Sequence, residues 1–362
     1  MIFELYWFYY LILLWSVISY VMIKKIHIQG SEMYYVIINY VPLSFILAYR
    51  APTIGSDTLG YINSFDWLSV APIDEFFVDN FECGYVLLNK IVYLCGGDGY
   101  TVIKCMAIFS MAGIGMFFLR YSENVYWSTI LFIAFGLFFP MANIIRQVLA
   151  SVFVLWAMGK LSENRRIIAC VLVLVGSTFH ASVILFLFFI FFYPINIKKI
   201  LLLVCISIGI FYFIQENGVL FMVDLPFMEN VKYLSYIDSK YGVSGEYGAL
   251  LLKAIMCFVI FVYGTYKYVY IQPEKKLLGM ASIMMYMSML ITLLGYQVII
   301  LGRFVYTYFL FFCILMPSLL MSKKHSTRIF VYAIAMIASF VYYTQTLSTL
   351  ENNYIYYIEN LF

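Results

Sequence analysis

Long apolar runs, separated by short polar stretches, constrain this chain more than any other feature. A helix that crosses a bilayer needs about 20 such residues. Ten runs approach or reach that length: Leu5–Ile23, Met33–Tyr49, Tyr100–Leu119, Val125–Met141, Ile144–Met158, Ile200–Ile214, Ala249–Tyr270, Leu277–Ile300, Phe304–Met321 and Ile329–Tyr343. Backbone groups in a bilayer must be paired within a helix or a closed barrel, and these runs lack the alternation of barrel strands. The sequence therefore predicts an all-α, polytopic transmembrane helical bundle, a single integral membrane domain over residues 1–362.

The composition agrees with this prediction and excludes a water-soluble body. The chain is 64% hydrophobic and 11% charged, whereas soluble proteins are about 45–50% apolar and about 25% charged. The first apolar run has no basic stretch ahead of it and no small-residue cleavage site. We therefore expect it to be a retained first helix rather than a signal peptide.

One further apolar segment, Ile167–Phe192, has a pair of arginines just before it and a pair of lysines a few residues after it. As one span, it would place these two basic pairs on opposite sides of the membrane. As two short helices broken near Gly176–Ser182, it returns both pairs to the same side. The tendency of cytoplasmic loops to carry lysine and arginine favours the broken form, which brings the total to about 11–12 membrane segments.

With this break, the basic residues separate by side. Fourteen of the 22 lysines and arginines fall on one side, which we expect to be the cytoplasm: Lys24, Lys25, Arg120, Lys160, Arg165, Arg166, Lys198, Lys199, Lys267, Lys275, Lys276, Lys323, Lys324 and Arg328. Two larger loops, residues 50–98 with interfacial helices and residues 215–248, then face outward together with both termini.

Three arginines run against this pattern, because Arg50, Arg146 and Arg303 stand at the outer edges of apolar helices. A single arginine at such a place often extends toward lipid headgroups. Three at the same depth suggest instead that their guanidinium groups converge on a phosphate or pyrophosphate, whose oxygens match the guanidinium fork.

Other outward polar residues also allow two interpretations. His180, the one ionisable residue within its apolar segment, is either a neutral histidine bonded to a backbone carbonyl at the helix break or a proton acceptor. Asp57 either caps an interfacial helix that continues through Tyr61 or binds sugar hydroxyls. Tyr233 and Tyr236 in the second loop either anchor it at the interface or offer aromatic faces to sugars.

Several motifs are missing from the sequence. It has no histidine or cysteine spacing typical of metal sites, no glycine-rich nucleotide loop and no nucleophile elbow, and no soluble cytoplasmic domain. We therefore expect no cofactor, no metal and no nucleic-acid partner, and a reaction whose energy comes with its substrate. Cys83 and Cys95 share one loop and either pair or stay free.

The order of five motifs carries a resemblance to a known family. They are "RAPTIGSDTLGY" (50–61), "FECGYVLLNKIVYLCGGD" (81–98), "NIIRQVLA" (143–150), "STFHAS" (177–182) and "GRFVYTY" (302–308), with a tyrosine-rich loop before the last. In this order the chain resembles the EpsG/Wzy-like family of bacterial polysaccharide polymerases, which make O-antigen, capsule or exopolysaccharide.

The resemblance implies a metal-independent membrane glycosyltransferase in the bacterial cytoplasmic (inner) membrane. Such an enzyme joins undecaprenyl-pyrophosphate-linked oligosaccharide repeat units on the outer, periplasmic face. It transfers the growing chain to the incoming repeat and releases undecaprenyl pyrophosphate. The implied partners are this lipid-linked oligosaccharide and the lipid bilayer, with the flippase and the chain-length regulator of the same pathway as further candidates.

The resemblance also assigns roles to residues. The motif positions fall on Arg50, Asp57, Tyr61, Glu82, Arg146, Gln147, His180 and Arg303. We assign Arg146 and Arg303 most strongly to the pyrophosphate, and Arg50 less so. His180 is the first choice as the base for the acceptor hydroxyl, and Asp57 the second.

Two other functions remain open at the level of sequence. A ligase that moves finished glycan, as an O-antigen ligase does, would share the outward arginines and the histidine. A non-enzymatic transporter of lipid-linked oligosaccharide is the other alternative, although such proteins often have internal repeats, and none is visible here.

Overall fold

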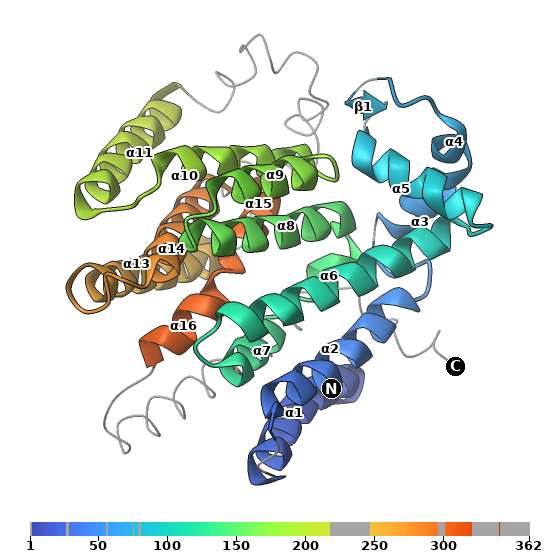
Figure 1. The fold of residues 1–362 in the computed structure, drawn as a ribbon, viewed down its shortest axis with the longest axis horizontal. Coiled ribbons are helices and arrows are strands. Elements are labelled where there is room, and N and C mark those ends of the chain that lie inside the picture. Colours follow the sequence, from blue (N-terminus) through green and yellow to red (C-terminus); the bar gives the residue numbers. More distant parts are fainter. Residues whose placement is uncertain are drawn as a thin grey trace. The chain divides into compact units, whose positions relative to one another are not determined.

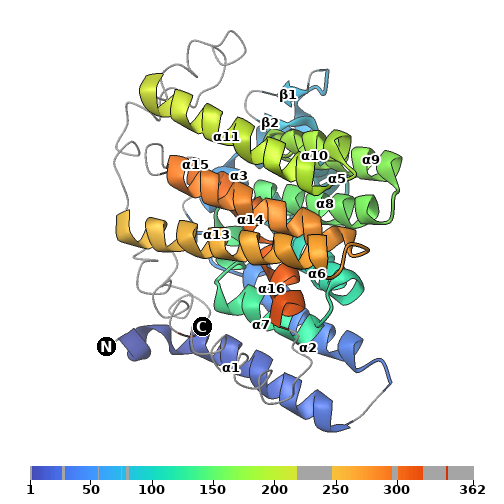
Figure 2. The same cartoon turned by 90° about the vertical axis from the view of Figure 1, so that its left-hand side faces the viewer.

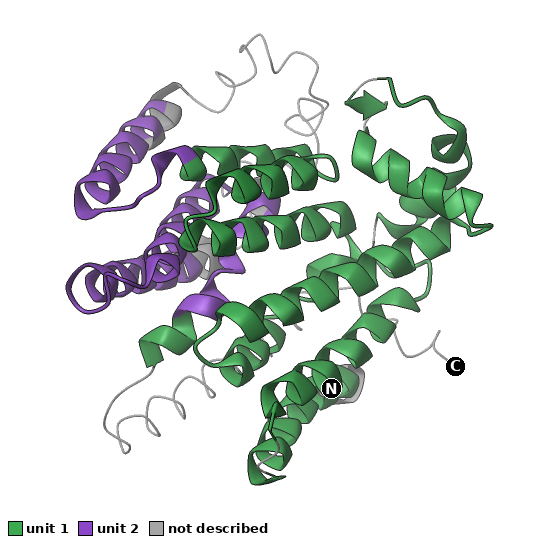
Figure 3. Cartoon of the chain, viewed as in Figure 1, with its two compact units in different colours: residues 1–190, 316–362 green, residues 191–315 purple. Residues whose placement is uncertain are grey.

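The structure is a computed structural model that describes residues 2–26, 29–55, 57–74, 76–78, 81–217, 247–295, 301–320 and 340 (Figures 1 and 2). The chain divides into two compact units, residues 1–190 with 316–362 and residues 191–315 (Figure 3). Tyr233 and Tyr236 lie outside the described residues, as does most of the predicted second loop.

Among the described residues, seven helical segments are long and apolar enough to cross a membrane. They are α1 (Ile2–Ile26), α2 (Ser31–Ala48), α6 (Gly99–Tyr121), α8 (Ile145–Ser162), α13 (Tyr247–Tyr270), α14 (Lys276–Gly295) and the segment Arg303–Leu320, which comprises most of α15 (Leu301–Phe309) and α16 (Phe312–Leu320). This confirms the predicted all-α, multi-pass membrane fold. The total of 11–12 segments stays a prediction, as does a single domain over the whole chain.

Three long helices form the frame of the first unit. Helices α2 and α6 are antiparallel, because Gly115 of α6 packs on Val36 and Tyr40, while the start of α6 lies beside the end of α2. Helices α6 and α8 run parallel, with Gly113 against Val152 and Gly159 against Tyr121. Of the most apolar 18-residue stretch of each helix, 72% is buried in α8 but only 28% in α1. Helix α8 is therefore the central helix of this unit.

The parallel pair α6 and α8 is joined by a return made of two pieces. Helix α7 (Val125–Ala134) is followed by the 3₁₀ helix η1 (Phe139–Ala142). The turn between them ends α7 with Gly136 at φ +63°, where Gly136 N–H bonds to Ile133 O and Leu137 N–H to Phe132 O, a glycine-dependent helix end. Because of this return, the C-terminal ends of α6 and α8 lie together.

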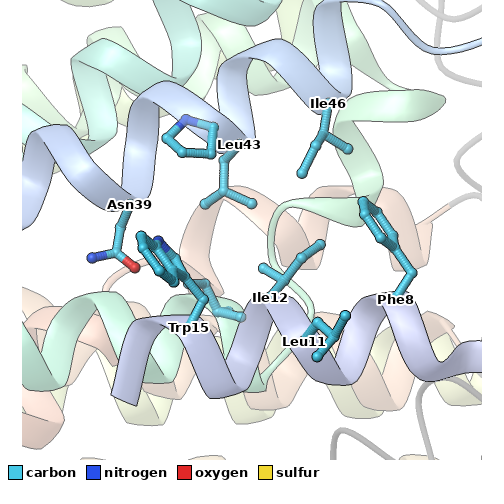
Figure 4. A pocket seen from close by; sticks show the side chains of 9 residues that line it. Phe8, Leu11, Ile12, Trp15, Asn39, Leu43 and Ile46 are labelled. Carbon is cyan, nitrogen blue, oxygen red and sulfur yellow. The ribbon is translucent and has the colours of Figure 1, made fainter. Parts of the chain in front are cut away.

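Helices α1 and α2 form a hairpin around a kink-prone position in α2 (Figure 4). Pro42 has no backbone N–H, so the carbonyl of Ile38, four residues earlier, loses its helical partner. The indole Nε1 of Trp15 in α1 donates to that carbonyl at 3.2 Å. Beside this contact is a cavity of about 210 Å³, lined by apolar side chains of both helices together with Asn39 and with Ile133 of α7. The carbonyl that the proline leaves free therefore gives α1 a hydrogen bond to α2.

The segment Ile167–Phe192 is broken where the sequence predicts it. Helix α9 (Arg166–Ser177) ends at a turn, and the 3₁₀ helix η2 (Ala181–Phe186) and α10 (Leu187–Phe192) follow. Gly176 near the end of α9 packs close to Val183 of η2, so η2 turns back along α9 (Figure 1). The two short helices predicted with a break near Gly176–Ser182 are confirmed.

The first loop contains more structure than its sequence indicated. It holds α3 (Thr58–Asn63), α4 (Phe65–Val70), the two-residue strands β1 (Phe77–Val78) and β2 (Phe81–Glu82) and α5 (Cys83–Leu94). The strands pair antiparallel, with Phe77 opposite Glu82, and they were not predicted because two-residue strands carry no periodic signal. Cys83 and Cys95 are both free. They lie at opposite ends of α5, about 18 Å apart for a 12-residue helix, too far for a disulfide.

The second unit contains α11 (Ile197–Asn217), α13, α14 and α15. Helices α11 and α14 are joined through the hydroxyls of Ser207 and Tyr286, which lie 2.6 Å apart. The hydroxyl of Tyr268 in α13 donates to the carbonyl of Ile195 at 2.9 Å. These contacts tie the predicted spans of this unit to each other and to the segment that precedes α11.

Candidate functional site

Three ionisable side chains of the first unit meet where α5, α8 and the α9–η2 break come together. The Arg146 guanidinium donates from Nη1 to Oε2 of Glu82. The other carboxylate oxygen, Oε1, lies 3.3 Å from Nδ1 of His180 and accepts the backbone N–H of Ala181 at 2.9 Å. The side chains of Arg146 and His180 are each 17% exposed and that of Glu82 is 5% exposed. The cluster is therefore largely buried but reachable.

The local backbone explains why Glu82 points into this cluster. Glu82 has extended dihedrals (φ −69°, ψ 145°) and precedes the first residue of α5, but its side chain does not cap that helix. Instead, the carbonyl of Thr178 accepts the N–H groups of Gly84 at 2.8 Å and Tyr85 at 3.2 Å, which satisfies donors left free in the first turn. The Glu82 carboxylate is thus available to contact Arg146.

Gly84 allows this docking of α5 on the helix break. A Cβ at position 84 would lie 2.1 Å from Oγ1 of Thr178 and 2.8 Å from its carbonyl oxygen. No side chain beyond hydrogen fits there unless the backbone moves. The glycine therefore sets the distance between Glu82 and the residues that follow Thr178, including His180.

Three aromatic rings surround the Arg146 guanidinium. Its carbon Cζ lies 4.8 Å from the ring centroid of Phe81, 5.5 Å from that of Tyr85 and 5.7 Å from that of Tyr61. Phe81 and Tyr85 are stacked, with centroids 5.5 Å apart. Cation–π contacts of this kind stabilise a charged group away from water. Arg146 Nε is buried and makes no hydrogen bond within the described part of the chain.

The electrostatics keep Glu82 ionised. Burial alone would raise the pKa of its carboxyl, but the contact with His180, the charge of Arg146 and the Ala181 N–H outweigh burial, and the net pKa is lowered. The carboxylate therefore stays charged at neutral pH. A negative charge facing Nδ1 of His180 favours a proton on that nitrogen, which leaves the lone pair of Nε2 to accept a proton.

Arg50 lies in a separate, structural environment. Its side chain is fully buried, donates from Nη1 to the carbonyl of Leu47 at 2.6 Å and contacts Thr58 Oγ1 at 3.3 Å. Its own carbonyl accepts a hydrogen bond from Tyr100. The guanidinium thus binds the last turn of α2 and the start of α3. Its predicted role at a phosphate stays a prediction, and these contacts favour a role in positioning the loop.

The segment after Arg50 is fixed to the residues just before α8. Gly55 has φ +88°, and a Cβ there would lie 2.0 Å from the carbonyl oxygen of Ala142. Thr58 Oγ1 lies 3.0 Å from the same oxygen. Asp57 is the half-buried N-cap residue of α3, one of the two interpretations that the sequence allowed, although no side-chain cap bond forms. These contacts place the first residue of α3 against the end of η1, just before α8.

The remaining predicted residues are distributed over both units. Gln147 is buried in α8, next in sequence to Arg146, and Tyr61 is 8% exposed with its ring edge on Tyr85. Arg303 is exposed in α15 of the second unit, so its predicted place in a shared crevice stays a prediction. Within the described residues, no three histidine, cysteine or acidic side chains lie close enough to hold a metal ion.

A comparison with protein families covers all of these positions. The model of the EpsG family matches residues 33–358. The chain belongs to the EpsG family. This membership confirms the resemblance carried by the five motifs and supports a general role in polysaccharide polymerisation. No curated protein and no solved structure shows a significant match.

In this EpsG family member, the sequence predicted Glu82, Arg146 and His180 as site residues, but it did not predict the neighbouring residues that hold them in place. Phe81 and Tyr85 were not singled out, although they flank Glu82 in "FECGY". Gly84 and Thr178 were missed as well, because a close backbone approach between distant segments has no local signature. The aromatic residues on either side of the acid were the one signal available in the sequence.

Proposed function

We propose that the chain is an oligosaccharide repeat-unit polymerase, a glycosyltransferase of the bacterial cytoplasmic membrane that works on the outer face. Its substrates are undecaprenyl-pyrophosphate-linked repeats. The growing chain moves from its lipid carrier to the non-reducing end of an incoming repeat, and undecaprenyl pyrophosphate leaves. The observation that carries this proposal is the convergence of Glu82, Arg146 and His180 in a chain of the EpsG family.

In this proposal His180 is the general base. Its Nε2 takes the proton of the acceptor hydroxyl as that oxygen attacks the anomeric carbon of the donor sugar. The bond between that carbon and the pyrophosphate oxygen breaks, and both electrons leave with the pyrophosphate. Glu82 is a positioning residue, because its charge faces Nδ1 at 3.3 Å and stabilises the imidazolium that forms.

Arg146 stabilises the leaving group. The pyrophosphate gains negative charge as the glycosidic bond breaks, so a fixed guanidinium nearby lowers the energy of the transition state more than that of the bound substrate. Arg146 is already fixed by Glu82 and three rings, so little reorganisation is needed when the charge develops. Arg303, Gln147 and Asp57 remain proposed substrate contacts, as do Tyr61, Tyr233 and Tyr236 at sugar rings, whereas the fully buried Arg50 is proposed to position the loop that follows α2.

The first test uses a strain whose polymer is visible as a ladder of chain lengths. Arg146→Ala is expected to lower the polymerisation rate by about 10²–10³-fold, the usual cost of one lost oxyanion donor, and to leave single-repeat product. Arg146→Lys keeps the charge but loses the planar fork, and we expect it to recover only part of the rate. His325→Gln, beside Lys323 and Lys324 in the sequence, serves as a histidine control for His180→Gln.

A double-variant comparison tests whether Glu82 acts through His180. If it does, the Glu82→Gln and His180→Gln losses will not add, and the double variant will be no slower than His180→Gln alone. Normal ladders in Arg146→Ala and His180→Gln, with the protein inserted at normal amounts, would remove the proposal. Free polymer that is made but not transferred would identify a ligase, and transport without bond formation by reconstituted protein would identify a carrier.

A further inference from the structure

A second charged cluster of the first unit lies at the other end of α8, where it meets α6 and α9. The turn between α8 and α9 is closed by Asn164 in the left-handed region (φ 64°). Asn164 N–H donates to Leu161 O at 2.9 Å, and Arg165 N–H donates to Lys160 O at 2.9 Å. This is the pair of hydrogen bonds of a Schellman motif, with asparagine in place of the usual glycine. The turn therefore fixes the directions of Glu163 and Arg165.

One carboxylate in this turn is shared among three cations. Glu163 Oε1 accepts from Arg120 Nη2 at 2.8 Å and from Tyr121 OH at 2.9 Å. Its Oε2 lies 3.1 Å from Lys160 Nζ and 3.6 Å from Arg165 Nε. Because Glu163 contributes a single negative charge, the four charged side chains keep a net charge of about +2 at neutral pH.

The arginine side chains of this corner are open to their surroundings, whereas that of Lys160 is 16% exposed. The Arg120 side chain is 51% exposed and that of Arg165 is 58% exposed, and Arg166, the first residue of α9, is exposed as well. Hydrogen bonds from Arg120 and Tyr121 hold the pKa of Glu163 at about 2, against an ordinary value of 4.5. The carboxylate therefore stays charged across the physiological range, and the excess positive charge is a permanent feature of this corner.

Directly after these cations, α9 presents a row of bare aliphatic side chains. Ile167, Val171 and Leu174, at positions i, i+4 and i+7, are 81%, 51% and 48% exposed, so they form one stripe on the helix surface. Helix α9 has 12 residues and is about 18 Å long, close to one leaflet of a hydrocarbon core about 30 Å thick. The stripe from Ile167 to Leu174 covers about 10 Å of this length and begins at the cations, so it can hold the part of an acyl chain nearest the headgroup.

We propose that this corner, defined by Arg120, Lys160, Glu163, Arg165 and Arg166, binds a phospholipid with a net negative charge. The headgroup phosphate lies against the arginines, and an acyl chain follows the Ile167–Leu174 stripe. The net positive charge selects an anionic phospholipid over a zwitterionic one, since each nearby lysine or arginine favours an anionic headgroup. The apolar stripe selects a lipid over a soluble anion.

The test measures lipid binding to the purified full-length chain by native mass spectrometry. Dioleoyl-phosphatidylglycerol and dioleoyl-phosphatidylcholine are titrated separately into wild type and R165Q/R166Q. Removing two cations is expected to weaken phosphatidylglycerol binding by about ten- to thirty-fold and to leave phosphatidylcholine binding unchanged. K24Q/K25Q removes an equal charge from the last turn of α1 and serves as the matched control, with an expected change below about two-fold.

One further variant and three competing outcomes test this explanation of lipid binding. R165K/R166K keeps the charge and should retain most of the preference for phosphatidylglycerol, and unchanged phosphatidylcholine binding by R165Q/R166Q shows that this variant did not lose the preference by misfolding. An equal loss in R165Q/R166Q and K24Q/K25Q would overturn the proposal in favour of diffuse charge attraction. Displacement of phosphatidylglycerol by millimolar inorganic phosphate would overturn it in favour of a soluble anion. Tight binding of an acidic peptide in place of the lipid would overturn it in favour of a protein partner.

Discussion

At the residue scale, the two charged clusters of the first unit use carboxylates in different ways. Glu82 is 4% exposed and holds a buried arginine and a histidine, whereas Glu163 binds exposed cations at a helix end. Removing one partner of a buried pair leaves an unpaired charge, which typically costs about 3–5 kcal/mol. An exposed ion pair contributes much less. We therefore interpret Glu82 as part of the candidate active site, and Glu163 as a residue that holds exposed cations together at the surface.

The lowered pKa of Glu163 predicts a pH-dependent contribution to stability. A carboxyl group whose pKa is lower in the folded state stabilises that state fully above its ordinary pKa of 4.5 and loses this effect as the pH falls toward about 2. We expect wild type to unfold at a higher temperature than Glu163→Gln at pH 7. The difference should shrink steadily between pH 4.5 and pH 3.

Intrinsic tryptophan fluorescence can follow this unfolding in detergent at every pH of the series, because Trp127 is buried in the folded protein. A difference in melting temperature that is the same at pH 7 and pH 3 would contradict the assigned cause, because Glu163 would then act through something other than its charge.

At the element scale, helix ends and interruptions decide how the helices meet. The Thr178 carbonyl caps α5, Asn164 closes α8, and Gly136 closes α7. Pro42 interrupts the hydrogen bonds of α2 and gives Trp15 of α1 a partner at 3.2 Å. At Thr178 and Pro42 a backbone group left free by one element is satisfied by another, and at Asn164 and Gly136 the residues just after the helix satisfy its own last carbonyls, as expected where water is scarce.

The Pro42–Trp15 contact predicts a coupling between two distant positions. Trp15→Phe should destabilise the protein by about 1 kcal/mol, because the Ile38 carbonyl loses its donor. In the Pro42→Ala background the new N–H of residue 42 can bond to that carbonyl, so Trp15→Phe should then cost much less. Melting temperatures of the four proteins measure this coupling. Equal costs in both backgrounds would mean that Trp15 contributes by packing alone.

At the scale of the whole first unit, the helices place the two charged clusters at opposite ends of α8. Arg146 is in its first turn and Glu163 follows its last residue, and an 18-residue helix is about 27 Å long, nearly the thickness of the hydrocarbon core. The candidate active site and the lipid-binding corner should therefore face opposite sides of the membrane. The excess of cations at the corner favours the cytoplasm for that end.

Cysteine labelling in intact cells tests this orientation. A variant that keeps only Cys95, which is exposed shortly before α6, should react with a membrane-impermeant maleimide added from outside. Asn164→Cys in a cysteine-free chain should react only after the membrane is permeabilised. The reverse pattern would place Glu82, Arg146 and His180 on the cytoplasmic side and would remove the proposed polymerase mechanism.

Some features of the site could be read from the sequence and others could not. The break near Gly176–Ser182 was predictable, because charge pairs on both sides of an apolar segment leave few arrangements in a membrane. Arg146 and His180 were predictable as residues that are costly at membrane depth. The pairing of both with Glu82 was not predictable from local pattern, since 64 residues separate Glu82 from Arg146. Arg50 and Arg146 both stand at the edge of an apolar helix in the sequence. Only the structure distinguishes them, because the Arg50 side chain is fully buried whereas that of Arg146 is 17% exposed.

The sequence by itself determined that the chain is a multi-pass helical membrane protein with one broken segment, because long apolar runs allow no other way to satisfy the backbone in lipid. Tertiary structure alone decided which arginine enters the candidate site, how closely α5 approaches Thr178 and where three cations share one carboxylate. These outcomes depend on contacts between segments far apart in the chain. Apolar patterning specifies that helices form, but packing and pairing of buried polar groups specify which of their faces meet.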